Sequence, residues 1–211
     1  MQLLPWTPAC AGVTISMMEP DLLERLTAIV RAAPILMRVL ETVRALDLPD
    51  WLVFSGAVYQ RVLNHLTGRA ADYGVRDYDV GYFDASDISY EAEDAVIRRA
   101  AGAFDGELRG VVEVRNQARV HVWFESHFGE AYTPLSRTAE ALERFVSPMF
   151  AVGVRLDAGD RLHVAAPFGL ADLFALRLRP NPLRPSGNFA RVAAGVTGRW
   201  PEVSVEAPAQ R

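Results

Sequence analysis

The stretch WLVFSGAVYQRVLNHLTGRAADYGVRDYDVGYFD, residues 51–84, decides the fold. It begins with a short apolar run and a glycine, then shows apolar positions at helical spacing over 57–66; this order predicts a buried strand, a turn and a helix. A polar loop over 67–74 leads to an acidic strand over 75–83. Asp77 and Asp79 lie on that strand. Because strand residues two apart point to the same side, their carboxylates are expected to lie side by side.

This carboxylate pair indicates a cation site. Two neighbouring carboxylates repel each other unless a cation lies between them, and a divalent metal is the ion that suits them. The Gly56 turn opens a helix nearby, and a helix N-terminus offers backbone N–H groups to an anion. A metal and an anion together indicate phosphate chemistry. A strand edge with two solvated aspartates explains the same spacing, and the spacing alone does not decide between them.

Composition places the chain among globular proteins. At 211 residues, half of them hydrophobic, it is long enough to bury a core. No apolar run is long enough to span a bilayer, and the first residues lack the basic region of a secretory signal, so a cytoplasmic location is expected. Residues 1–18 have no clear periodicity and are predicted to be a disordered tail. Residues 19–207 are predicted to form a single domain.

Charge limits the chemistry. The net charge is −4, without a long basic run, which argues against a long nucleic acid as partner. All 22 basic residues are arginine, which excludes a P-loop lysine and a lysine nucleophile. Phosphate contacts must then come from arginine, backbone N–H groups or a metal. The candidates are Arg76, Arg115 and Arg119, since arginine suits bidentate contacts, although each is also typical of a surface ion pair.

The remaining patterns predict an α+β protein with a mixed central sheet and helices packed on it. Helices are expected over 20–46 with a break at Pro34, after a cap at Asp87 or Ser89 toward Phe104, and over 138–145, 167–177 and 188–199. A β-type run is expected over 111–124, interrupted by a polar turn at 116–119. A β-hairpin is expected around 157–160.

Glu113 lies inside the apolar run VVEV and is the candidate third carboxylate. Two carboxylates on one strand and one on a neighbour can hold two divalent ions about 4 Å apart. Asp84 is the rival, but ideal alternation puts it on the face opposite Asp79 unless a bulge intervenes. Asn116 beside the run is expected either to line a substrate pocket or to hydrogen-bond a buried turn.

The order of strand, glycine turn, helix, Asp-x-Asp strand and later acidic strand is similar to the DNA polymerase β-type nucleotidyltransferase superfamily. The strings SGAVYQRVLNHLTG, DYDVGYFD, VEVRNQARVHVW, AVGVRL and APFGLADLFALRLRPNP resemble one bacterial branch, the nucleotidyltransferase family proteins once treated as a domain of unknown function. This resemblance covers residues 20–205. It implies a metal-dependent transferase fold in which Asp77, Asp79 and Glu113 take the positions of the metal-binding carboxylates.

The function expected from this resemblance is transfer of a nucleoside monophosphate from an NTP to an unknown acceptor, with Mg²⁺ or Mn²⁺ as cofactor. Glu113 would complete the metal site or act as base, and Ser55 and Gly56 would approach the phosphates. The acidic chain favours a small acceptor. The superfamily's Gly-Gly or Gly-Ser pair is replaced here by Ser55-Gly56-Ala57, which supports an alternative: an inactive nucleotidyltransferase fold that binds a nucleotide or partner. A transferase that modifies a protein or tRNA is a third possibility. The sequence leaves the oligomeric state open.

Overall fold

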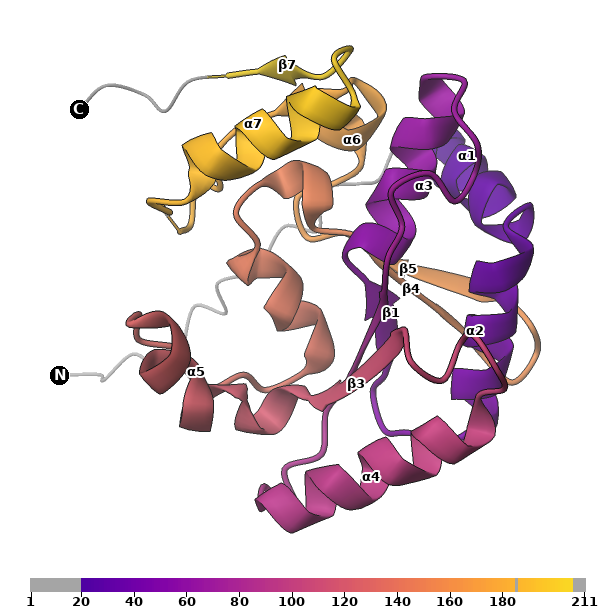
Figure 1. The fold of residues 1–211 in the computed structure, drawn as a ribbon, viewed down its shortest axis with the longest axis vertical. Helices are drawn as coiled ribbons and strands as arrows, with labels where there is room; N and C mark the ends of the chain where they lie inside the picture. Colours follow the sequence, from indigo (N-terminus) through magenta and orange to yellow (C-terminus); the bar gives the residue numbers. More distant parts are fainter. Residues whose placement is uncertain (1–19, 185, 207–211) are drawn as a thin grey trace, which may run out of the picture.

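A five-stranded mixed sheet forms the centre of the computed structural model, which describes residues 20–184 and 186–206 (Figure 1). The strand order is β3-β2-β1-β4-β5. The strands are β1 (Leu52–Phe54), β2 (Tyr78–Tyr82), β3 (Val112–Asn116), β4 (Gly153–Leu156) and β5 (Leu162–Ala165). β2 and β3 are parallel, and the other neighbouring pairs are antiparallel. The predicted α+β class with a mixed central sheet is confirmed.

Helices and short 3₁₀ segments connect and cover these strands. The α-helices are α1 (Pro20–Arg31), α2 (Pro34–Ala45), α3 (Gly56–Leu66), α4 (Tyr90–Ala103), α5 (Val120–Phe128), α6 (Ala171–Phe174) and α7 (Phe189–Arg199). The 3₁₀ segments are η1 (Gln117–Arg119), η2 (Thr138–Arg144) and η3 (Pro148–Phe150), and β6 (Arg177–Leu178) pairs with β7 (Ser204–Val205). Among the helices of the described residues, none is long and apolar enough to cross a membrane. The tail predicted over residues 1–18 lies outside the described part.

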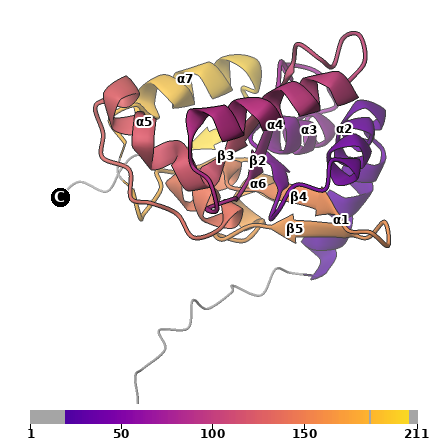
Figure 2. The same cartoon turned by 90° about the horizontal axis from the view of Figure 1, so that it is seen from below.

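One row of valines runs across all five strands and fixes the buried face of the sheet. The strand register pairs Val114 with Val80, Val80 with Val53, Val53 with Val154, and Val154 with Val164. Paired residues point to the same face, and this face packs against α2, α3 and α4, which lie on the same side of the sheet (Figure 2). Residues adjacent to these valines along the strands must therefore face the other side.

The adjacent row of the register carries the polar side chains. Glu113 pairs with Asp79, Asp79 with Phe54, Phe54 with Gly153, and Gly153 with Ala165. Only part of this face is covered: Phe54 belongs to a small second core that η2 helps to build. The sheet thus buries its valines on one side and presents two carboxylates and an aromatic ring on the other.

Local signals place several helices where the sequence predicts them. Pro34 begins α2, where its missing N–H costs nothing. The Ser89 side chain accepts a hydrogen bond from the Ala92 N–H and caps α4. Of the two predicted capping residues, Asp87 and Ser89, the structure therefore has Ser89. The hairpin of β4 and β5 and the helix over 189–199 are also present as predicted.

Three predicted elements are corrected. After Asn116 the chain does not continue as alternating β structure: the Asn116 side chain accepts a hydrogen bond from the Ala118 N–H, starts η1, and leads into α5. Residues 138–144 form a 3₁₀ helix instead of an α-helix. The helix expected over 167–177 is limited to Ala171–Phe174. The first correction moves Trp123 from a strand to a helix.

Candidate active site

The candidate site is centred on Asp79, at the start of β2. Asp79 lies opposite Glu113 of the parallel strand β3 and opposite Phe54 of β1. Asp77 comes just before the strand begins, and its side chain is exposed. Both Asp77 and Glu113 lie close enough to Asp79 to act on its charge. The structure therefore groups the three predicted carboxylates electrostatically around the half-buried Asp79.

The pKa of Asp79 records this environment. The pKa of the carboxyl is raised from 3.8 to about 6, chiefly by burial. A hydrogen bond from the Ser55 side chain lowers this pKa, the negative charges of Asp77 and Glu113 raise it, and the positive charge of Arg115 lowers it. A carboxyl under this pressure is stabilised by taking up a proton or by a neighbouring cation. The site thus has an unmet demand for positive charge.

The carboxylates suit a divalent metal in kind, because hard cations prefer oxygen ligands. Their arrangement is more open than a closed metal centre: within residues 20–184 and 186–206, no group of three or more His, Cys, Asp or Glu side chains is positioned to hold a metal ion. Glu113 is exposed and has Arg115 Nη2 at 4.0 Å from its Oε2. Metal binding by Asp77, Asp79 and Glu113 therefore stays a prediction.

Asp84, the rival third carboxylate, is occupied elsewhere. Its Oδ1 accepts hydrogen bonds from the Ser86 backbone N–H at 2.9 Å and from the Ser86 hydroxyl at 2.5 Å. These bonds lower the pKa of Asp84. Because Asp84 is turned toward its own loop while the register holds Glu113 beside Asp79, the geometry favours Glu113.

The turn between β1 and α3 adjoins these carboxylates. Ser55 has φ 63° and ψ −144°, a conformation that residues other than glycine adopt only under strain, which is common at functional sites. Among the described residues no side chain caps α3; the Val58 and Tyr59 N–H groups donate to the Ser55 carbonyl oxygen, which leaves those of Gly56 and Ala57 for an anionic ligand. At Gly56, an added Cβ would lie 2.7 Å from Gln60 Nε2. The turn thus combines a strained serine, a helix start and a close approach.

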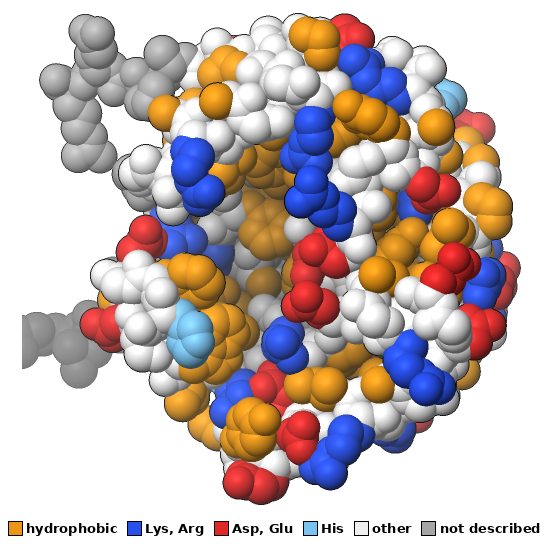
Figure 3. Space-filling model, viewed as in Figure 1, with side chains coloured by type: hydrophobic (Ala, Val, Ile, Leu, Met, Phe, Trp, Pro, Cys, Tyr) orange, Lys and Arg blue, Asp and Glu red, His pale blue; other side chains and the backbone are white. Residues whose placement is uncertain are grey.

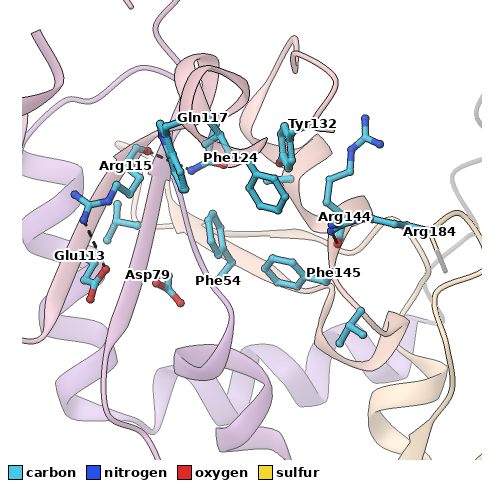
Figure 4. Close-up of a pocket in the computed structure, with 15 residues that line it drawn as sticks. Phe54, Asp79, Glu113, Arg115, Gln117, Phe124, Tyr132, Arg144, Phe145 and Arg184 are labelled. Atoms are coloured by element: carbon cyan, nitrogen blue, oxygen red, sulfur yellow. Dashed lines mark hydrogen bonds and ion pairs between the residues drawn. The ribbon is translucent and has the colours of Figure 1, made fainter. Parts of the chain in front are cut away.

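A cavity of about 460 Å³ opens beside Asp79 on this face of the sheet (Figure 4). It is lined by two carboxylates, three arginines, five aromatic rings and a few other residues. The carboxylates are Asp79 and Glu113, and the arginines are Arg115, Arg144 and Arg184. The rings are those of Phe54, Trp123, Phe124, Tyr132 and Phe145, and the other residues are Val80, Gln117, Val120, Ala141 and Val146. The space-filling view shows a hollow with hydrophobic side chains inside and charged side chains along its rim (Figure 3). Its size and mixed lining are those of a small-molecule site.

The predicted phosphate-binding residues separate into two groups. Arg115 lines the cavity, and Arg76 is an exposed residue directly before Asp77. Asn116 and Arg119, in contrast, do not line it. The Asn116 side chain exchanges hydrogen bonds with the backbone of Asp84, donating to its C=O at 2.8 Å and accepting from its N–H at 3.1 Å. Of the two uses predicted for Asn116, the structure supports the buried turn.

Arg119 is held in a buried ion pair. Its guanidinium bonds to the Glu93 carboxylate of α4, and its Nε donates to the Ile88 carbonyl oxygen at 3.2 Å. The same carboxylate accepts the Asn116 backbone N–H at 2.8 Å. This network ties the end of β3 to α4, so Arg119 supports the strand that carries Glu113 and is not positioned at the cavity.

The far wall of the cavity was not foreseen from sequence. Phe124 comes from α5, Tyr132 from the loop that follows, Arg144 and Phe145 from the end of η2, and Arg184 from a loop near the C-terminus. No spacing in the sequence links these segments to β2. The aromatic content of residues 123–132 is the one local signal that could have indicated them.

Comparison with known proteins identifies the class. A family model described as nucleotidyltransferase matches residues 41–205, and the chain belongs to this family. The fold is similar to a solved NMR structure described as revealing a CCA-adding enzyme head domain, with 21% sequence identity, a TM-score of 0.69, and coverage of 88% of this chain and 96% of that chain. No curated protein sequence matches the chain. Family membership supports nucleotidyl transfer and implies an NTP substrate, and the structural neighbour shows the fold.

Proposed function

We propose that the chain transfers a nucleoside monophosphate from an NTP to a hydroxyl or phosphate oxygen of a small acceptor. The observation that carries this proposal is the strand register that sets Asp79 beside Glu113, next to the Ser55 turn and at the edge of the cavity. Family membership supplies the reaction class. The local geometry supports these residues as the candidates for the site.

In the proposed reaction the acceptor oxygen forms a bond to the α-phosphorus of the NTP. The bond between the α-phosphorus and its bridging oxygen breaks, and pyrophosphate leaves with that oxygen. An acceptor hydroxyl gives its proton to a carboxylate at the site. Glu113 is the candidate proton acceptor where it does not itself bind the metal, because a bound ion would hold Asp79 ionised and occupy its oxygens.

Asp77, Asp79 and Glu113 would hold Mg²⁺ or Mn²⁺. The bound ion would screen the charge of the phosphates and favour an ionised acceptor oxygen. The raised pKa of Asp79 supports this assignment, because a nearby cation would stabilise its ionised form. Within the described residues these side chains are not arranged as a metal site, so binding the ion would require them to move.

Ser55, Gly56 and Arg115 are proposed to contact the triphosphate. The N–H groups at the start of α3 favour an anion, and Arg115 lies on β3 at the carboxylate end of the cavity, beside Glu113. Arg76 is close in sequence to Asp77 and is the second candidate guanidinium. Asn116 and Arg119 are proposed to act indirectly, by fixing the end of β3.

The acceptor is proposed to be small. The cavity of about 460 Å³ is sized for one compact molecule, and the net charge of −4 disfavours a long polyanion. The structural neighbour is described as a head domain of a CCA-adding enzyme. A nucleic-acid end is therefore the acceptor to test against the small molecule.

The test is release of pyrophosphate from each NTP with Mg²⁺ or Mn²⁺, with pooled small metabolites or total RNA as acceptors. We expect release with the small-molecule pools, its loss in Asp79→Asn, and its retention in Asp47→Asn, a matched change on an exposed turn. Binding of NTP without release in any pool would favour the inactive binding module instead. Release only with RNA, or a one-nucleotide mass shift on a protein, would overturn the small acceptor.

A further inference from the structure

The cavity has a charged group at each end and aromatic rings between them. Asp79 and Glu113 lie at the end formed by the sheet, and Arg144 lies at the other end, with Phe54 and Phe145 between them (Figure 4). Nucleotidyl transfer alone requires the carboxylate end. The aromatic rings and Arg144 have no role in the nucleotidyl transfer step itself.

Two aromatic pairs form the walls. The rings of Phe54 and Phe145 meet edge to face with centroids 5.8 Å apart, and those of Phe124 and Tyr132 lie 4.6 Å apart at 43°. The first pair joins segments distant in sequence, the second joins α5 to the loop that follows it, and all four rings line the cavity. Aromatic walls favour planar or apolar rings through stacking and edge contacts. This middle section is therefore suited to a ring-bearing ligand.

The arginine end is suited to an anion. The Arg144 guanidinium carbon lies 5.7 Å from the centre of the Tyr132 ring, and within the described residues no carboxylate pairs with it. The nearby Glu140 is engaged with Ser136, whose N–H and hydroxyl donate to its two oxygens at 2.7 and 2.6 Å, and with Arg137, whose Nε lies 3.6 Å from its Oε1. Arg144 acts on the charge of Glu140 as well, but does not pair with it. A partly buried guanidinium without a carboxylate partner favours a ligand carboxylate or phosphate.

Arg184 supports this end of the cavity without competing for the anion. Its Nη2 bonds to the Glu130 carboxylate, its Nη1 donates to the Arg144 carbonyl oxygen at 2.9 Å, and it lies over the Phe124 ring at 5.5 Å. These contacts hold the Arg144 backbone against the aromatic wall. Among the described residues at this end of the cavity, the available cation is therefore Arg144, and Arg184 positions it, while Arg115 lies at the carboxylate end beside Glu113.

We propose that the acceptor is a small molecule with a planar ring and an anionic group, either carboxylate or phosphate. Its ring lies among Phe54, Phe145, Phe124 and Tyr132, its anion pairs with Arg144, and a hydroxyl faces Asp79. The carboxylate end repels the anion, so the two ends together orient the molecule with its hydroxyl toward the reacting phosphate. This inference rests on the proposed function, because it assigns the triphosphate to the Ser55 turn and leaves the cavity to the acceptor.

The inference is tested by calorimetric binding of four simple probes to the full-length protein without nucleotide. The probes are 4-hydroxyphenylacetate and phenyl phosphate, which are anionic, p-cresol, which is neutral, and tyramine, which is cationic. We expect the better anionic probe to bind about 10-fold to 100-fold more tightly than p-cresol, as a charge-assisted pair predicts. Whichever anion binds more tightly identifies the acceptor's anionic group. Tyramine is expected to bind more weakly than p-cresol.

Variants assign the effect to Arg144. Arg144→Gln should remove the preference for anions and leave the affinity for p-cresol unchanged, which also shows that the cavity remains folded. Arg191→Gln is the control: Arg191 is exposed on α7 and does not line the cavity. It should keep the preference.

Three results would overturn the inference. Anionic probes that bind no better than p-cresol would remove the anion site, and an unchanged preference in Arg144→Gln would move it elsewhere. Displacement of phenyl phosphate by a magnesium complex of a non-hydrolysable NTP would show that the cavity holds the nucleotide. NTP binding that depends on Asp79, measured on the same protein, reports the proposed function separately, because the four direct probe titrations, unlike the displacement experiment, contain no NTP.

Discussion

Replacing Asp79 with asparagine should stabilise the metal-free protein at neutral pH. The folded state raises the pKa of this carboxyl from 3.8 to about 6, chiefly through burial. Between these two values the unfolded chain loses a proton that the folded protein retains, so stability falls as pH rises through this window and the full loss is present above pH 6. Asparagine carries no charge and should escape this loss.

The size of the effect follows from the pKa. A rise from 3.8 to about 6 corresponds to about 3 kcal/mol, at about 1.36 kcal/mol for each pH unit. Asp79 is half-buried, so solvent screening should reduce the measured gain, and we expect about 1–3 kcal/mol at pH 7.5. At pH 4, close to the unfolded pKa of 3.8, the carboxyl is protonated in the folded state and only about half ionised in the unfolded chain, so most of the gain should be gone. The asparagine oxygen can still accept the hydrogen bond from Ser55.

The assay is urea unfolding in EDTA at pH 7.5 and pH 4, comparing wild type with Asp79→Asn. Asp47→Asn is the control, because Asp47 is exposed, has φ 50° and lies in a turn conformation that asparagine tolerates well. A loss of stability in Asp79→Asn at pH 7.5 would refute the reasoning. An equal gain at both pH values would also refute it, since it would not depend on ionisation.

Three further substitutions test the frame around the site. Gly81→Ala would place a Cβ 2.6 Å from Phe54 Cε1, so we expect a loss of about 1–3 kcal/mol in urea unfolding and weaker probe binding in the cavity; an unchanged protein would contradict this packing. Arg61→Met removes a buried guanidinium bonded to Asp72 and should cost about 2–4 kcal/mol in the same assay. Ser55→Gly should relieve the positive φ and raise stability by about 1 kcal/mol while slowing pyrophosphate release; a simultaneous loss of stability would argue against strain.

Much of the fold follows from local sequence patterns. The turn and helix after Trp51 and the Ser89 cap have signals within a few residues, and the structure has these elements near the predicted positions. The pairing of Asp79 with Glu113 is less direct: alternation puts both on strands, but only the parallel register of β2 and β3 places them side by side. That register depends on packing across the whole sheet.

The errors have a common physical cause. The run after Asn116 has the β-branched and aromatic residues of a strand, but the Asn116 side chain caps a 3₁₀ turn, and packing then favours a helix. Arg119 is a residue type that commonly binds phosphate, but its guanidinium forms a buried ion pair with Glu93. Arg144 reaches the cavity through tertiary packing of a 3₁₀ segment, for which the sequence has no periodic signal.

Asp77, Asp79 and Glu113 are proposed to bind a divalent metal ion that also contacts the phosphates of the nucleotide. A crystal structure with Mn²⁺ and a non-hydrolysable NTP tests it most directly, because manganese is located by its anomalous scattering. We expect an anomalous peak from a manganese ion that is coordinated by oxygens of these carboxylates, with the triphosphate bound at the Ser55 turn. A nucleotide bound elsewhere, or a manganese ion without contact to Asp79, would contradict it.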